Sequence, residues 1–104
     1  MANDEAMMEC ARALGRRIHE VAAEDTRRVA FAYELCLARM PEQRELTRLV
    51  LLIRAMKADF TSDLDAAAEF LGDSKTSSES IADVAACTAL ARVVLNLDEF
   101  IVRE

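Results

Sequence analysis

His19 is the single histidine of the sequence and the first residue whose chemistry has to be considered. Metal sites in helical bundles often pair a histidine with a glutamate three positions earlier, but Arg16 occupies that position here. Since no second histidine and no cysteine cluster is present, we expect His19 to be solvated near a helix C-terminus. The sequence therefore predicts no metal ligand, no cofactor in this chain and no catalytic residue.

The three cysteines, Cys10, Cys36 and Cys87, are far apart, and an odd number cannot all pair within one chain. The spacings of zinc ribbons and haem attachment sites are absent. Each cysteine lies among apolar residues with helical periodicity, where a free thiol packs as a small hydrophobe. We therefore expect three structural cysteines and no reactive thiol or disulfide.

Asp98 and Glu99 are neighbouring carboxylates near the end of the chain. Adjacent helical residues point about 100° apart, so the two side chains do not converge on one substrate atom. Asn96 lies three residues before Glu99 and can share its face. Because no base partner is indicated, we expect a structural hydrogen-bond network here rather than general acid catalysis.

Arg39 precedes Pro41, which ends a predicted helix and opens a corner. An arginine can bind C-terminal carbonyls and a carboxylate together, and our hypothesis is that Arg39 ties this corner to the last helix through Asp98 or Glu99. The alternative is an ordinary exposed arginine at a helix C-terminus. The sequence contains no Gly-rich phosphate loop, nucleophile elbow or EF-hand loop.

The composition predicts that helices position all of these residues. Among 104 residues there are 19 alanines, two glycines and one proline, and no run alternates apolar with polar residues. We expect one domain, 1–104, an all-α bundle of four main helices plus one short helix. The predicted helices span about 4–22, 25–39, 43–60, 64–71 and 81–104. The last is apolar around most of its circumference, which is typical of a central helix.

Local signals add detail to this bundle. The short connection near Asp25, the expected cap of the second helix, predicts that the first two helices pack antiparallel. Gly15 either allows a close helix approach or is a weak point. Thr76 and Glu79 fit a capping box before the last helix, and Ser62 with Asp65 fits one before the short helix.

Apolar residues at helical spacing predict which face of each of the first three main helices is buried. The expected buried stripes are Met7, Ala11, Leu14, Ile18 and Val21; Val29, Ala32, Cys36 and Met40, widened by Phe31, Leu35 and Ala38; and Leu46, Leu49, Val50, Ile53, Met56 and Phe60. Tyr33 is expected at the edge with its hydroxyl in water, and Glu45 can pair with Arg48.

The charge balance excludes some function classes. The net charge is −6, and the basic residues are scattered among more numerous acids, which disfavours nucleic-acid binding. A membrane span needs about 20 apolar residues in a row, and the longest run, 49–53, is far shorter. The acidic start of the chain carries no visible export signal.

Three segments of the sequence, 3–14, 31–46 and 88–100, together resemble the C-terminal part of a domain of unknown function from large planctomycete proteins. The corner of that family reads like G-R-x-P-T-x-x-E-L, with a tryptophan near the start of the last helix. Here Ala38 replaces the glycine, Glu42 the threonine and Cys87 the tryptophan. The structural signature residues are Arg39, Pro41, Glu45, Asn96, Glu99 and Phe100. The family accompanies cytochrome-c-like modules and is often exported. The resemblance thus implies a segment of a larger, exported or periplasmic protein whose haem lies elsewhere.

Two classes of function follow. The first is a non-catalytic helical packing or interaction module of a larger protein, whose partner is another part of that protein or a second copy. The alternative is a fragment of an exported redox or hydrolytic enzyme whose active site lies outside this chain. A flat apolar patch favours the first class, and a polar cleft with strongly shifted titrating groups favours the second.

Overall fold

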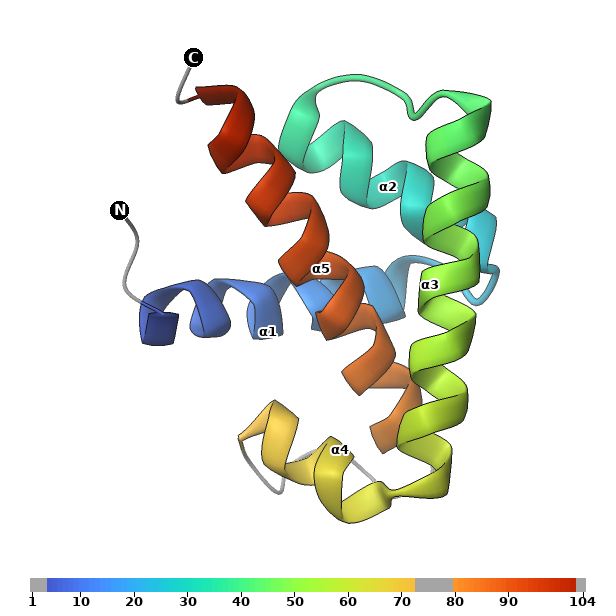
Figure 1. Cartoon of the computed structure of the whole chain (residues 1–104), viewed down its shortest axis with the longest axis vertical. Helices are drawn as coiled ribbons and strands as arrows, with labels where there is room; N and C mark the ends of the chain where they lie inside the picture. The colour runs from blue at the N-terminus through green and yellow to red at the C-terminus, as the bar shows by residue number, and fades with distance from the viewer. Residues whose placement is uncertain (1–3, 73–79, 103–104) are drawn as a thin grey trace.

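The last helix, α5 (Ile81–Val102), is the element that the other helices surround. The computed structural model describes residues 4–72 and 80–102, with the side chains of residues 5–72 and 80–97. The preceding helices are α1 (Asp4–Val21), α2 (Asp25–Leu37), α3 (Gln43–Ser62) and α4 (Leu64–Leu71), and these described ranges contain no strand. Because α5 contacts each of the other four helices (Figure 1), the predicted all-α bundle with a central last helix is confirmed.

The helix boundaries follow from local backbone chemistry. α2 ends at Leu37, two residues before the predicted end, because Ala38 turns into the left-handed conformation with φ 56°. α4 begins after Asp63, whose carboxylate accepts from the Ala66 N–H at 3.0 Å, so the expected capping role of Ser62 is wrong. Gly72, with φ 76°, ends α4 as predicted. The expected capping box of Thr76 and Glu79 lies outside the described residues.

The core is centred on one stripe of α5. Cys87, Leu90, Ala91 and Val94 are fully buried, and they pack against buried apolar residues of α1, α2 and α3. A smaller cluster joins α4 to the first turns of α5. At the other end Leu97 is 37% exposed, so the predicted burial of α5 holds along most of its described length but ends near this residue.

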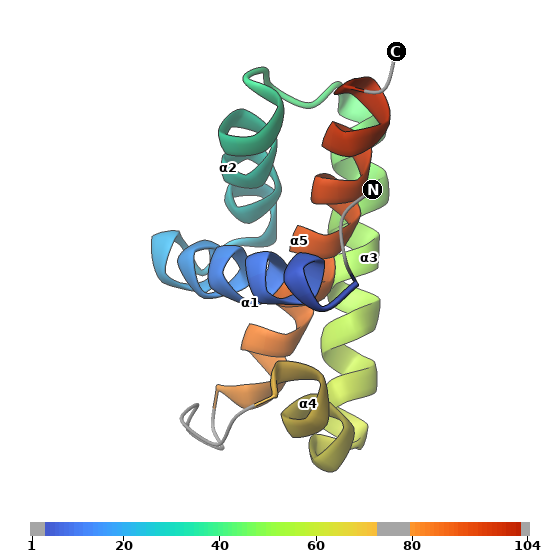
Figure 2. The ribbon, with the colours of Figure 1, turned by 90° about the vertical axis from the view of Figure 1, so that its left-hand side faces the viewer.

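The crossing of α1 over α5 depends on Gly15. A Cβ placed on this glycine would lie 2.7 Å from the Cα of Thr88 and closer still to the Thr88 hydroxyl oxygen, which donates to the Val84 carbonyl at 2.9 Å. Of the two roles open for Gly15, the structure therefore supports the close approach. Figure 2 shows α1 crossing α5 and α2 rising steeply away from the end of α1, so the predicted antiparallel packing of α1 and α2 is wrong.

This crossing leaves some expected core positions uncovered. Val21 and Leu35 are 48% and 46% exposed, because no described helix packs over the last turn of α1 or the outer side of α2. Met40 is 59% exposed because α2 ends before it, at Leu37. Tyr33 differs in the opposite sense, since it is buried rather than at the wet edge. Among the described helices, none combines the length and the apolar character that a bilayer span requires.

Candidate functional site

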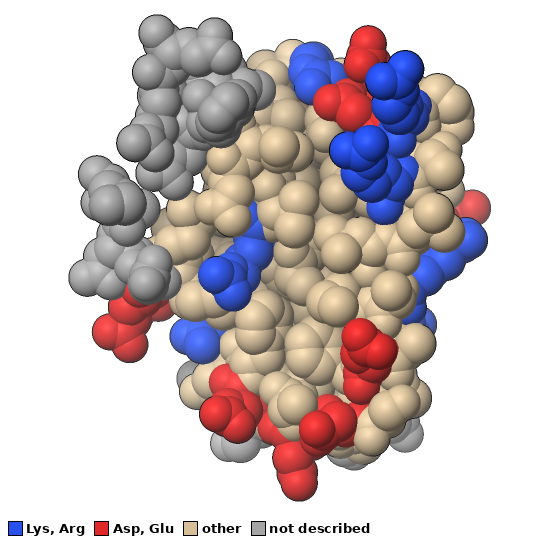
Figure 3. All heavy atoms as spheres, viewed as in Figure 1, with Lys and Arg blue, Asp and Glu red and all other residues tan. Residues whose placement is uncertain are grey.

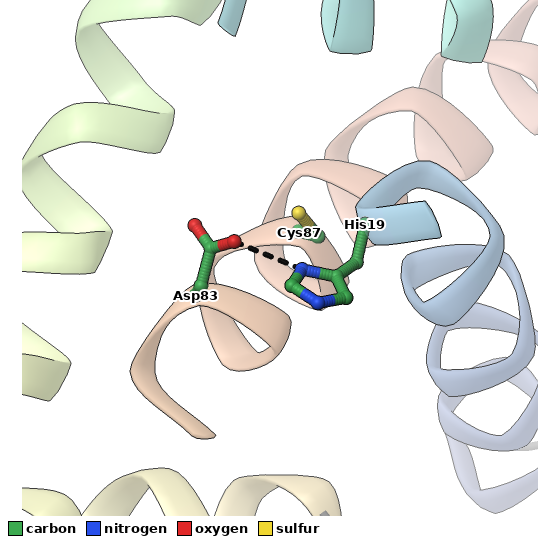
Figure 4. Close-up of side chains that lie close together, drawn as sticks. All are labelled: His19, Asp83 and Cys87. Carbon is green, nitrogen blue, oxygen red and sulfur yellow. Dashed lines mark hydrogen bonds and ion pairs between the residues drawn. The ribbon is translucent and has the colours of Figure 1, made fainter. Parts of the chain in front are cut away.

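The titratable side chains that gather most closely in the described chain come from four different helices. His19 lies near the end of α1, Arg28 in the first turns of α2, Lys57 on α3 and Asp83 in the first turn of α5. We call these four residues the buried charge cluster, after the buried Arg28 at its centre; the Lys57 side chain reaches it from the surface and is 56% exposed. Cys87 lies one turn beyond Asp83 on α5, and Figure 4 shows the His19 ring pointing toward both of these residues.

Helix positions explain how the cluster forms. Asp83, Cys87, Leu90 and Val94 follow the helical period and lie on one stripe of α5, so Asp83 begins the stripe that continues into the core. Arg28 directly precedes the fully buried Val29 and is itself only 3% exposed. A carboxylate whose side chain is only 16% exposed and a buried guanidinium are thus brought together from residues 55 positions apart.

Arg28 forms the geometric centre of the cluster. Its Nη1 donates to Asp83 Oδ1 and its Nη2 donates to Asp83 Oδ2, each at 2.9 Å. Its Nε donates to the Ala22 carbonyl at 2.7 Å, which lies just past the end of α1. One guanidinium therefore joins α2, α5 and the α1–α2 connection, and its bidentate geometry is the strong form of such a pair.

Two further nitrogen groups, the Lys57 ammonium and the His19 ring, approach the same carboxylate. Lys57 Nζ lies 3.3 Å from Asp83 Oδ1, and His19 Nδ1 lies 2.8 Å from Oδ2. Burial alone would raise the pKa of Asp83, but the hydrogen bonds and charge of Arg28, helped by Lys57, lower it to about 2. Since an ionised carboxylate only accepts, the Nδ1 of His19 must carry the proton that it donates. His19 is therefore a partly buried member of the network, and the expectation of a solvated histidine is wrong.

Cys87 adds a thiol beside this network. His19, Asp83 and Cys87 each offer a ligand atom, and these atoms lie within 4.8 Å of one another, a grouping that could in principle hold a metal. Burial raises the pKa of the Cys87 thiol to about 12, although the charge of Arg28 opposes this effect. A metal needs the thiolate, and it would also have to compete with Arg28 for an oxygen of Asp83, since Arg28 donates to both.

The same contacts argue against nucleophilic catalysis. Cys87 is fully buried and protonated at neutral pH, whereas a reactive thiol needs an accessible site and a lowered pKa. A carboxylate that accepts from the Nδ1 of a histidine also occurs in catalytic triads, but among the described residues no hydrogen bond joins the His19 ring to the Cys87 thiol. The arrangement is chemically suited to holding four helices together, and its donors and acceptors are used for that purpose.

The predicted signature residues form a second, exposed site at the corner between α2 and α3. Arg39 donates from Nη1 to Glu45 Oε1 at 2.9 Å and from Nη2 to Oε2 at 2.8 Å, and it also donates to the Met40 carbonyl. Its guanidinium lies 5.1 Å from the centre of the Tyr33 ring. We call Arg39 and Glu45 the exposed corner, and Pro41 lies on the loop between them; Tyr33, which the Arg39 guanidinium contacts, is itself buried. The structure therefore brings Arg39, Pro41 and Glu45 together.

Glu45 has two roles in this corner. Its Oε1 accepts from the Glu42 backbone N–H at 2.8 Å, which completes the start of α3 in the manner of a capping box. The hydrogen bonds from Arg39 and from this N–H lower the pKa of Glu45 to about 2. The predicted pairing of Glu45 with Arg48 is wrong, because Arg39 occupies both carboxylate oxygens.

The remaining signature residues lie near the end of α5. Asn96 is exposed beside Val93 on a shallow hollow of the surface. The side chains of Asp98, Glu99 and Phe100 lie outside the described residues, so the expected tie from Arg39 to α5 stays a prediction. The described partner of Arg39 is Glu45.

Sequence reasoning did not identify Arg28 and Asp83, although a signal was present. Asp83 is a charged residue on the core stripe of the most apolar helix, four positions before Cys87 and seven before Leu90. A carboxylate in that position has to be neutralised by a buried cation. Arg28, beside Val29 on the buried row of α2, is a candidate of the required charge.

Comparison of the chain with protein-family models, with curated proteins and with solved structures finds no match. The resemblance to the planctomycete domain therefore stays a prediction. One observation at the corner is compatible with it: Ala38, which stands where that family has glycine, adopts a left-handed φ that glycine favours.

Proposed function

We propose that this chain is a non-catalytic helical module that packs against another polypeptide, either a further part of a larger protein or a second copy. Nucleic acid is not its partner in this proposal. The side chains best suited to chemistry are engaged in a structural network, so the function has to be sought on the surface. The observation that carries the proposal is a continuous apolar groove on that surface.

The groove consists of two adjoining hollows that share Phe60, Phe70 and Arg92. The first, about 450 Å³, lies against α1 and α4, and the second, about 280 Å³, lies against α3 and α5. Together they form what we call the α1–α4–α5 groove. Its remaining lining residues are Met8, Arg12, Met56, Ala66, Glu69, Ala89, Val93 and Asn96.

The composition of the groove is that of a protein contact surface. Aromatic residues, methionine and arginine are the types enriched at interfaces, and all three line it. Figure 3 shows that the centre of the face containing α5 and α4 is largely uncharged, while acidic side chains gather at the lower edge where α4 lies. Contiguous apolar surface with a polar rim is the arrangement expected of an interaction site.

Other large apolar side chains extend the uncovered surface. Leu35 and Phe31 line hollows on the outer side of α2, and Leu51 on α3 is 60% exposed. Scattered apolar residues are normal on any protein, so these alone would carry no proposal. Leu35 and Leu51 are instead alternative contact sites, and an experiment has to distinguish them from the groove.

Two measurements test the proposal. Sedimentation velocity between about 5 and 500 µM detects self-association of the isolated chain. A photo-crosslinking amino acid placed singly at Met8, Leu35 or Leu51 in the natural host then captures a neighbouring polypeptide, which mass spectrometry identifies. Gln43, an exposed polar position on α3, serves as the matched control. We expect a concentration-dependent dimer or one discrete adduct from at least one apolar position and none from Gln43.

A monomer at every concentration, together with no discrete adduct from any of the three apolar positions, would overturn the proposal. The position that forms the adduct reports which apolar surface is in use. An adduct at any of the three apolar positions therefore supports an interaction module, and the position itself identifies the surface that binds the partner.

A further inference from the structure

We propose that the α1–α4–α5 groove binds an amphipathic helix whose apolar face covers Phe60 and Phe70 and whose carboxylates pair with Arg12 and Arg92. This inference rests on the proposed function and names the surface and the partner chemistry. A helix laid in a groove is a common mode of peptide recognition, with apolar anchors on one face and charges along its flank.

The apolar floor of the groove is built from two aromatic rings. Phe60 at the end of α3 and Phe70 on α4 stack with their centroids 5.4 Å apart and their planes inclined by 26°. Both side chains are only partly buried, and they pack against the small core cluster that joins α4 to α5. The rings therefore rest on a fixed base while part of their surface remains open to a partner.

The two arginines supply charge at the sides of this floor. Arg12 donates from Nε to the Phe70 carbonyl at 3.1 Å, so α1 holds this guanidinium against the last turn of α4. Gly72 makes room for it, because a Cβ there would lie 2.9 Å from the central carbon of the guanidinium. Arg12 is thus fixed in place at the edge of the first hollow.

Arg92 is the cation best placed to recognise a partner. It is exposed on α5, it lines both hollows, and within the described part of the chain it has no hydrogen bond or ion pair. Arg92 and Asn96 lie one and two turns beyond Thr88 on the polar stripe of α5. Thr88 is covered by Gly15 of α1, whereas the next two residues of the stripe emerge from under α1 into the groove.

Charge complementarity defines the occupant. The whole chain has a net charge of −6, yet this groove presents two arginines against the single carboxylate of Glu69. A partner that matches both the rings and the guanidiniums has to be apolar on one side and acidic along its flank. Because the hollows are open rather than enclosed, they cover one side of a ligand, which suits a helix.

The test uses a pair of helix-stabilised peptides of identical apolar face, one flanked by glutamates and its twin flanked by lysines. Binding to the ¹⁵N-labelled full chain is followed by two-dimensional NMR. We expect the acidic peptide to bind with shift changes at Phe60, Phe70 and Arg92. The variant Arg92→Glu should weaken the acidic peptide at least tenfold and improve binding of the basic twin.

Arg44→Glu is the matched control, since it makes the same charge change at an exposed position of α3 outside the groove. It should leave both affinities within twofold of the original chain. Circular dichroism of Arg92→Glu should show an unchanged melting temperature, because this side chain supports no described contact.

Three results would overturn the inference: no binding of either peptide, equal loss in Arg92→Glu and Arg44→Glu, or shift changes centred on Phe31 and Leu35 instead. If crosslinking at Leu35 or Leu51 still captured a partner, the groove would be the wrong surface and the proposed function would stand. If neither peptide bound, the chain stayed monomeric and no position gave a crosslinked adduct, both proposals would be wrong.

Discussion

Among the described residues, two bidentate arginine–carboxylate pairs are nearly identical in hydrogen-bond length and opposite in setting. Arg28 and Asp83 are joined by two bonds of 2.9 Å, and Arg39 and Glu45 by bonds of 2.9 and 2.8 Å. The Arg28 side chain is 4% exposed, whereas that of Arg39 is 45% exposed. Hydrogen-bond geometry alone therefore does not determine how much a salt bridge stabilises the fold, because burial sets the free-energy cost of breaking it.

Breaking the buried pair from one side should have the largest effect. Arg28→Ala leaves Asp83 ionised and without its main partner at the junction of four helices, and it frees the Ala22 carbonyl. We expect a loss of about 3–5 kcal/mol of the free energy of unfolding, measured by urea denaturation, since removing one partner of a buried pair strands a charge.

Arg28→Lys is the control, because it keeps the charge but cannot donate to two carboxylate oxygens and a carbonyl in one plane. It should fall between the wild type and Arg28→Ala. A loss below about 1 kcal/mol in Arg28→Ala would show that the buried pair behaves like an exposed one, and the comparison would fail.

The two pairs should also differ in how much stability the protein loses at acidic pH when each carboxylate is protonated. The pKa of Asp83 is lowered from 3.8 to about 2, so its stabilising contribution is complete above pH 3.8 and is lost as the pH falls toward 2. Between pH 5 and pH 2 this contribution falls by about 2 kcal/mol. The stability difference between the wild type and Asp83→Asn, measured by urea unfolding at both pH values, should shrink by that amount.

Glu45 has a similarly lowered pKa, from 4.5 to about 2, but lies in water-exposed surroundings. Solvent screening should make its acid sensitivity much weaker than its pKa suggests. Glu45→Gln should therefore retain most of the acid-induced loss of the wild type. If Glu45→Gln abolished that loss, the exposed corner rather than the buried charge cluster would control acid stability.

These two pairs also mark how far the sequence could be used for prediction. Arg39, Pro41 and Glu45 lie within seven residues. Local corner chemistry singled out Arg39 and Pro41, whereas Glu45 joined them only through the family resemblance and was expected to pair with Arg48 rather than with Arg39. The five helices could also be predicted from the sequence, because apolar periodicity, Pro41 and Gly72 are local signals. The fold class and the central position of α5 followed from them.

The buried charge cluster could not be predicted from local sequence signals. Asp83 and Arg28 are separated by 55 positions, and their meeting depends on how α1 crosses α5 at Gly15. A short connection predicted antiparallel packing of α1 and α2, but contact between the backbones of Gly15 and Thr88 favoured a crossing instead. The partial burial of His19 and the exposure of Val21 depend on that tertiary geometry, which apolar periodicity in the sequence does not encode.

Breaking the exposed pair should have a small effect. Glu45→Gln removes both bonds to Arg39 and weakens the start of α3, with an expected loss of under about 1 kcal/mol in urea unfolding. Arg39→Ala should lower the melting temperature by a few degrees at most, roughly 2–4 °C. Added salt at 1 M should reduce the difference between wild type and Glu45→Gln, since exposed charges are screened.

Unchanged melting of Arg39→Ala would remove the idea that this arginine anchors the corner at all. A loss as large as that of Arg28→Ala would indicate a further buried partner, of the kind expected at Asp98 or Glu99. The two outcomes thus test the exposed corner from both sides.

The smallest expected change is a gain in the free energy of unfolding, from a substitution beside the exposed corner. Ala38 adopts φ 56° at the end of α2, where a side chain costs about 1–2 kcal/mol relative to the right-handed region. Glycine removes that cost but loses more chain entropy on folding, by about 0.4–1 kcal/mol. Ala38→Gly should therefore stabilise the protein by roughly 0.5–1 kcal/mol in urea unfolding.

Ala23→Gly is a suitable control, because it introduces the same residue at another exposed loop position for which no left-handed φ occurs. It should be neutral or slightly destabilising. If Ala38→Gly were also destabilising, the left-handed corner would not be strained. Glu45 and Arg39 would then hold a backbone conformation that alanine already tolerates, and the exposed pair would contribute even less than proposed.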